Sequence, residues 1–248
     1  MSNRISAEKI GAAIDVARLV DTATSLIEVP SPTLSAGAAA DRLESILHKD
    51  GFEAERPVAN WPESPAVVAR LESGKPGKIL QFDGHLDTVH LPFVPPRQEG
   101  GNLYGSGAAD MKGGLAACVE AMRVLRELDG LPAGGVLLTA HDHHEGPWGD
   151  RRQAIALIEE GYTGDAALFP EYLSTHLPIA GRGMAIFEIT VRRDGDPVHE
   201  VLRPDDLPDV LGTGVELAQR LQKLGTEVAR NTHPHSGHDS LFLGTISC

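Results

Sequence analysis

Histidine and acidic side chains recur in this sequence at spacings that suit metal-dependent hydrolysis. In the stretch FDGHLDTV, His85 and Asp87 stand two residues apart on an expected strand, so their side chains point to the same face. Asp110 follows in the glycine-rich stretch LYGSGAADMKGGLAA, just before an expected helix. A carboxylate at that position is favoured by the helix dipole and the free backbone amides. These residues form a first candidate cluster.

A second set of such residues lies further along the chain. His144 and Glu145 belong to HDHHEGPWGD, which follows the apolar run GVLLTA, and Glu171 belongs to LFPEYLS, which follows another apolar run. Open α/β sheets bind ligands at the carboxyl ends of their strands, where these residues are expected. Mixed imidazole and carboxylate ligands suit zinc or a similar transition metal. Two such ions about 3.5–4 Å apart form a hydrolytic centre.

The elements that must position these residues alternate along the chain. Apolar residues at helical spacing predict helices over 7–29, 35–49, 112–129, 150–160 and 210–224. Short apolar runs predict strands over 66–71, 79–82, 135–140 and 166–169, and later over 184–193 and 241–246. Ser6 is the expected cap of the first helix. Strands alternating with helices indicate an α/β fold with an at least partly parallel sheet.

Composition narrows the classes of function. The 248 residues carry a formal net charge of −13, which argues against nucleic acid or an anionic membrane as the main partner. The chain has two cysteines, Cys118 and Cys248, too few for a disulfide framework, and they suit a reducing compartment. No signal peptide and no run long enough to span a membrane is visible. We therefore expect a cytoplasmic protein with no membrane partner.

Taken together and in this order, FDGHLDTV, LYGSGAADMKGGLAA, HEGPWG, FPEY and GRGMAIFEITV resemble the co-catalytic zinc exopeptidase and deacylase family. Its members include acetylornithine deacetylase, succinyl-diaminopimelate desuccinylase, aminoacylase and carboxypeptidase G. The resemblance implies a three-layer catalytic portion at 1–180 and the first part of an inserted ferredoxin-like (α+β) lid at 181–248. It also implies hydrolysis of amide bonds in N-acyl amino acids or small peptides, with two zinc ions (or cobalt or manganese) and a possible homodimer formed through the lid.

The resemblance assigns roles by position. His85 matches a metal ligand and Asp87 the carboxylate that orients it. Asp110 matches the aspartate that bridges both metals, while Glu145 matches a ligand of the second metal and Glu171 a ligand of the first. Arg182 matches the glycine-flanked entry to the family's lid and His199 the lid histidine after the first lid strand, and both are candidates to bind the substrate. Because the chain is acidic, an anionic substrate would also need a local cation, for which Arg182 and Lys112 are the candidates.

Two departures from the family pattern leave alternatives open. His144 stands where the family has an acidic general base, and an imidazole is also a competent base near neutral pH. The chain is also expected to end inside the lid, before the segment that carries the second metal's histidine in the family. A truncated, inactive fragment and a non-catalytic module that binds a small ligand are therefore the alternatives.

Taken singly, the same residues have simpler explanations. His85 and Asp87 alone suit a buried hydrogen-bonded pair, and Asp110 alone suits a helix cap. A metal site built from His141, His143 and His144 is another possibility, although strand alternation would put His144 on the opposite side from the other two. The later histidines of HPHSGHDS suit a solvated loop: His233, His235 and His238.

Overall fold

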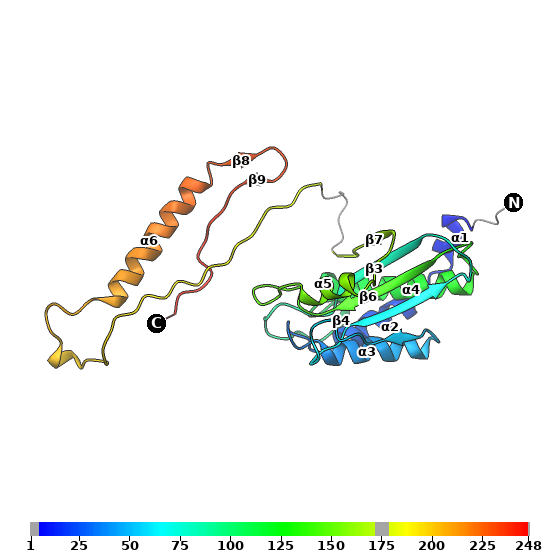
Figure 1. Cartoon of the computed structure of the whole chain (residues 1–248), viewed down its shortest axis with the longest axis horizontal. Coiled ribbons are helices and arrows are strands. Elements are labelled where there is room, and N and C mark those ends of the chain that lie inside the picture. The colour runs from blue at the N-terminus through cyan, green and yellow to red at the C-terminus, as the bar shows by residue number, and fades with distance from the viewer. Residues whose placement is uncertain (1–4, 172–178, 248) are drawn as a thin grey trace. The chain divides into compact units, whose positions relative to one another are not determined.

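The computed structural model describes residues 5–171 and 179–247, and its contacts divide the chain into two compact units, Met1–Leu173 and Ser174–Cys248. Figure 1 shows the first unit as a sheet with helices and the second as a long helix with extended chain. Among the described residues, no helix is both long enough and apolar enough to cross a bilayer. All the residues expected to bind metal belong to the first unit.

A five-stranded mixed sheet forms the centre of the first unit. Its spatial order is β1-β2-β6-β3-β7, and the strands are β1 (Ala54–Glu55), β2 (Val67–Glu72), β3 (Ile79–His85), β6 (Gly135–His141) and β7 (Ala166–Leu168). β3 runs parallel to both β6 and β7, whereas β2 is antiparallel to β6. The loops after β3, β6 and β7 therefore leave the sheet at one edge, as the sequence predicted.

Helices cover both faces of this sheet and give the expected three layers (Figure 1). Val136 and Leu138 of β6 pack in the main core with residues of α3 (Gly37–Lys49) and α4 (Gly113–Glu127). Leu137, which points the other way, packs against Leu157 of α5 (Arg152–Glu159). The strand between these layers is fully buried, which explains its unbroken apolar run.

The helix expected over 7–29 is two helices. α1 (Ala7–Ala12) is capped by the Ser6 hydroxyl, as predicted, and α2 (Val16–Ile27) begins separately after Asp15. The Asp15 carboxylate accepts a hydrogen bond from the Arg18 amide at 3.0 Å. Asp15 therefore caps the N-terminus of α2 and separates this helix from α1. The sequence analysis also missed β1 and the hairpin of β4 (Arg97–Glu99) and β5 (Asn102–Tyr104).

An ion-pair network fixes α2 against α4. Glu120 is 1% exposed and accepts hydrogen bonds from Arg18 at 2.8 Å and from the Asp15 amide at 3.0 Å. Arg123, also buried, contacts Glu120 at 3.3 Å and Asp50 at 2.6 Å. Because each buried charge has an opposite partner, the helix that follows Asp110 has a defined position.

The second unit contains α6 (Val210–Val228), a helical turn η2 (Glu200–Leu202) and a short hairpin of β8 (Thr232–His233) and β9 (Gly237–His238). α6 confirms the helix expected from residue 210. The strands expected over 184–193 and 241–246 do not form, because no described strand pairs with either segment. An alternating pattern predicts a strand only where a neighbour completes its hydrogen bonds, so the lid stays a prediction.

Candidate metal centre

His85 and Asp110 come together as the sequence predicted. β3 ends at His85. The ring nitrogen Nε2 of His85 lies 3.0 Å from the Oδ1 atom of Asp110. Asp110 belongs to an irregular turn, η1 (Ala108–Lys112), that leads directly into α4. The other ring nitrogen, Nδ1, lies 2.9 Å from the backbone oxygen of Asp87. That contact fixes the ring so that Nε2 faces the carboxylate.

The Asp87 carboxylate joins two loops. It lies 3.5 Å from Nδ1 of His85 and accepts hydrogen bonds from the backbone amides of His144 at 3.1 Å and Glu145 at 2.9 Å. Burial alone would raise the pKa of Asp87, but the hydrogen bonds from His85 and the Glu145 amide lower it. Asp87 thus stays ionised and holds the loop after β3 against the loop after β6. The sequence predicted its contact with His85 but not its contacts with the two amides.

Carboxylates surround the buried imidazole of His85. Burial would lower the pKa of the His85 imidazole, but the hydrogen bond to Asp87 and the charges of Asp87 and Asp110 raise it to about 9. Nearby, burial and the charge of Asp110 raise the pKa of Glu145. The contributions of Asp87 and Asp110 to both shifts indicate carboxylates placed close together in a partly buried space. A divalent cation would offset their charge.

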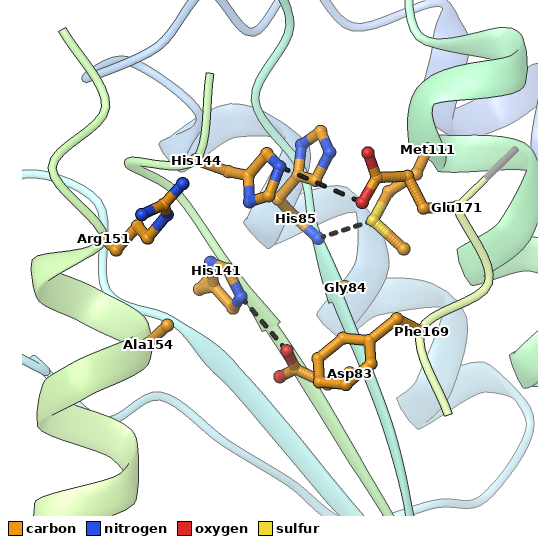
Figure 2. Close-up of a pocket in the computed structure, with 10 residues that line it drawn as sticks. All are labelled: Asp83, Gly84, His85, Met111, His141, His144, Arg151, Ala154, Phe169 and Glu171. Carbon is orange, nitrogen blue, oxygen red and sulfur yellow. Dashed lines mark hydrogen bonds and ion pairs between the residues drawn. The ribbon is translucent and has the colours of Figure 1, made fainter. Parts of the chain in front are cut away.

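Two sets of side chains place their ligand atoms within 4.8 Å of one another: His85 with Asp110 and Glu145, and His85 with His144 and Glu171. Both sets share His85, so all the residues expected to bind metal converge in one place. The donor set of imidazole nitrogens and carboxylate oxygens fits zinc. Figure 2 shows His85, His144 and Glu171 around one cavity, to which Phe169 and Met111 add apolar surface.

His144 lies within this cluster. Its ring stacks on the His85 ring with centroids 4.1 Å apart, and its Nε2 atom lies 3.9 Å from Glu171 (Figure 2). Burial and the charge of His85 lower the pKa of His144. Its imidazole is therefore neutral at physiological pH and able to accept a proton. The same position also suits a metal ligand.

A glycine contact positions Glu171. A Cβ atom at Gly114, in the first turn of α4, would lie 1.9 Å from the backbone oxygen of Pro170. Only a glycine lets the loop that carries Glu171 approach the helix so closely.

We expect Gly114→Ala to weaken zinc binding roughly 10- to 100-fold, the usual effect of disturbing the residues that support a ligand. The added methyl group would push Pro170 and Glu171 away although no ligand is removed. Competition with a chelating dye measures the affinity. Gly11→Ala is the control, because a Cβ at Gly11 meets nothing within 4 Å. Equal zinc affinities for both variants would contradict this role for Gly114.

Lys112 does not serve as a substrate-binding cation. Its side chain is fully buried, and Nζ donates a hydrogen bond to the backbone oxygen of Val29 at 2.7 Å, away from the cavity. Burial lowers the pKa of Lys112 to about 8, although the charge of Asp87 opposes that change. The prediction for Lys112 was wrong. The residue is close in sequence to the proposed ligand Asp110, but its side chain points into the core.

The other sequence candidates lie in the second unit. Arg182 donates a hydrogen bond to the backbone oxygen of His238 at 2.7 Å, and the exposed His199 ring accepts one from the Val201 amide at 3.3 Å. Their role toward a substrate stays a prediction. In the described part of the chain, neither ligand set includes the histidines at 233, 235 and 238.

A metal site made of His141, His143 and His144 is excluded by the geometry. β6 ends at His141, and His143 adopts a left-handed backbone with φ of 67°, so strand alternation stops there. His143 is fully buried with its ring against Trp61, at a centroid distance of 4.5 Å. Asp142 accepts hydrogen bonds from the Leu34 and Ala36 amides and is therefore structural.

Comparison with known proteins finds relatives of this chain. A model of the peptidase family M20/M25/M40 matches residues 82–242, which is more than half of the chain. Succinyl-diaminopimelate desuccinylase of Rhodospirillum centenum is 31% identical over 244 aligned residues, which cover 90% of this chain and 61% of the relative. The chain thus spans about three-fifths of the length of that curated relative.

Solved structures show the same fold. The aminopeptidase PepT of Bacillus cereus superposes with a TM-score of 0.55 and 26% identity, over 63% of this chain and 43% of that one. Human carnosine dipeptidase 1 gives a TM-score of 0.52 with 19% identity, over 65% of this chain and 40% of the other.

Proposed function

Because the chain belongs to the peptidase family M20/M25/M40, we propose that it supplies the metal-binding side of an active site for amide hydrolysis. The substrates are N-acyl amino acids or small peptides. The observation that carries the proposal is that two sets of ligand atoms meet at His85: one with Asp110 and Glu145, the other with His144 and Glu171, each within 4.8 Å. The names of the similar proteins, a desuccinylase and an aminopeptidase, support this class of substrate.

In this proposal the chain holds two zinc ions. By the resemblance, His85 and Glu171 would hold the first ion, Glu145 would hold the second, and Asp110 would serve both. When bound, zinc polarises a substrate carbonyl and lowers the pKa of water. Asp87 orients His85 through Nδ1, so that Nε2 is directed toward the ion.

His144 moves the proton in the proposed reaction. Its neutral Nε2 accepts a proton from the attacking water and returns it to the nitrogen of the leaving amine. Glu171, at 3.9 Å, keeps the ring close to the reacting atoms and stabilises the imidazolium that forms. The second unit is proposed as the first part of a lid that brings Arg182 and His199 to the substrate and offers a dimer surface.

Metal stoichiometry tests the proposal. Elemental analysis of the purified chain, after loosely bound ions are removed, is expected to give two zinc ions per chain. A single ion would overturn the dinuclear centre, and its absence would overturn the metal site altogether. Hydrolysis of N-acyl amino acids by the loaded chain is the accompanying assay, because stoichiometry alone does not establish the reaction.

A further inference from the structure

The cavity beside the candidate metal centre contains one permanent cation. Its volume is about 190 Å³, below the roughly 300–1,000 Å³ of pockets for drug-sized ligands. Among the described residues that line it, Arg151 is the only lysine or arginine. Figure 2 shows Arg151 on the same side of the cavity as His141 and His144. The sequence analysis did not identify this residue.

The side chain of Arg151 differs from that of Arg152 because, among the described residues, it has no hydrogen-bond or ion-pair partner. The Arg152 guanidinium is bound by Asp150, with contacts of 2.6 and 2.8 Å, and lies over the Trp61 ring. Within the described part of the chain, the Arg151 guanidinium has neither a hydrogen bond nor an ion pair. It is thus a cation without a counter-charge beside the cavity.

The backbone places Arg151 there at some strain. Its φ is 61°, in the left-handed region that non-glycine residues rarely adopt, and its amide donates a hydrogen bond to the backbone oxygen of His143 at 2.9 Å. Such strain persists where the surrounding structure enforces it, and it gathers at functional sites. An asparagine or glycine would fit this position more easily than an arginine.

The two acidic residues among the described lining of the cavity, Asp83 and Glu171, both have partners other than Arg151, and Glu171 lies 3.9 Å from His144. Asp83 accepts a hydrogen bond from the Thr139 hydroxyl, and its other oxygen lies 3.5 Å from Nε2 of His141 (Figure 2). All three side chains lie on the face of the sheet that bears α5. The guanidinium of Arg151 therefore remains available to a ligand.

We propose that Arg151 binds a free carboxylate of the substrate and selects substrates that carry one. This inference rests on the proposed function, because it assigns the specificity of that same site. A guanidinium binds a carboxylate through two parallel hydrogen bonds, which gives geometry as well as attraction. In a chain with a net charge of −13, an anionic substrate needs such a local cation.

Three small probes identify which carboxylate is bound. N-Succinylglycinamide carries one on the acyl group, N-acetylglycine carries one on the amino acid, and N-acetylglycinamide carries none. Binding to the full chain is followed by NMR titration, first without metal and then with zinc. We expect one of the two carboxylate probes to bind at least tenfold more tightly than the neutral probe.

Arg151→Ala is expected to weaken binding of that probe roughly 10- to 100-fold, the range for losing a hydrogen bond to a charged group, and to leave the neutral probe unchanged. Arg151→Lys should recover part of the loss, because the charge remains but the paired hydrogen bonds do not. Arg97→Ala is the matched control, because Arg97 is an exposed arginine of the first unit that does not line the cavity, and this variant should bind all three probes as the parent chain does. Arg151→Gly should lose the preference while its thermal midpoint does not fall.

Three results would overturn the inference: no preference for either carboxylate probe in the parent chain, equal weakening of all three probes by Arg151→Ala, or an equal effect of Arg97→Ala. Zinc stoichiometry separates this test from that of the proposed function. If the parent chain binds zinc but shows no carboxylate preference, only the inference on Arg151 fails. If the parent chain prefers a carboxylate probe but does not bind zinc, the proposed metal centre is refuted and the role of Arg151 is retained.

Discussion

Replacing Asp110 by alanine is expected to reduce the zinc content of the chain from two ions to none. One carboxylate serves both ions in the proposed centre, so its loss removes a ligand from each. It also removes the partner that lies 3.0 Å from Nε2 of His85. Asp110→Asn should have nearly the same effect, because an amide keeps the shape of the side chain but not its charge. Elemental analysis after dialysis gives the stoichiometry.

Asp83→Asn is the matched control for this experiment. Asp83 lines the same cavity and lies on the same strand as His85, but it belongs to neither ligand set. The Asp83→Asn variant should therefore retain both zinc ions. Two tightly held ions in Asp110→Ala would refute the bridging role, and one retained ion would show that Asp110 serves a single metal. Loss of zinc from Asp83→Asn would show that the effect is not specific to a ligand.

Replacing His144 by alanine should keep the zinc and lower turnover by roughly 10²–10⁴-fold, the usual contribution of a positioned base. The reason is the position of its neutral ring, stacked on His85 and 3.9 Å from Glu171. The measurement pairs zinc content with the rate of hydrolysis of an N-acyl amino acid. Zinc content is the more informative readout, because it is meaningful even for a variant that turns over slowly.

His144→Glu supplies the comparison. It introduces a carboxylate, the type of group that the resembled family carries here, and should restore turnover to within about tenfold of the parent. If His144→Ala instead loses zinc, the residue is a ligand, as its place beside His85 and Glu171 also permits. If His144→Ala changes neither the zinc content nor the turnover, another group transfers the proton and the role assigned to His144 is refuted.

The layers of the first unit were predictable because burial leaves a clear trace in sequence. GVLLTA is apolar throughout, since β6 lies between helices on both faces. Strand ends followed by histidine or acid were then enough to bring His85, Asp110 and Glu171 to one edge. The family comparison confirms this part of the fold.

The features that sequence did not predict depend on three-dimensional neighbours. Whether Lys112 reaches the cavity depends on a hydrogen bond to Val29, which no spacing rule anticipates. The importance of Arg151 depends on a left-handed backbone and on Asp150 being taken by Arg152. The strand expected over 184–193 lacked a partner, and a pattern of alternating residues does not reveal whether one is present.

The contacts of Asp87 have a consequence for the thermodynamics of metal binding. Its carboxylate connects the loop after β3 to the backbone of His144 and Glu145 through hydrogen bonds within the protein. Ordering a loop on binding consumes conformational entropy. Because Asp87 supplies that ordering, we expect the entropy change on zinc uptake to come chiefly from released water and displaced protons. Asp87→Ala would shift that ordering to the binding step and make the entropy of zinc uptake less favourable.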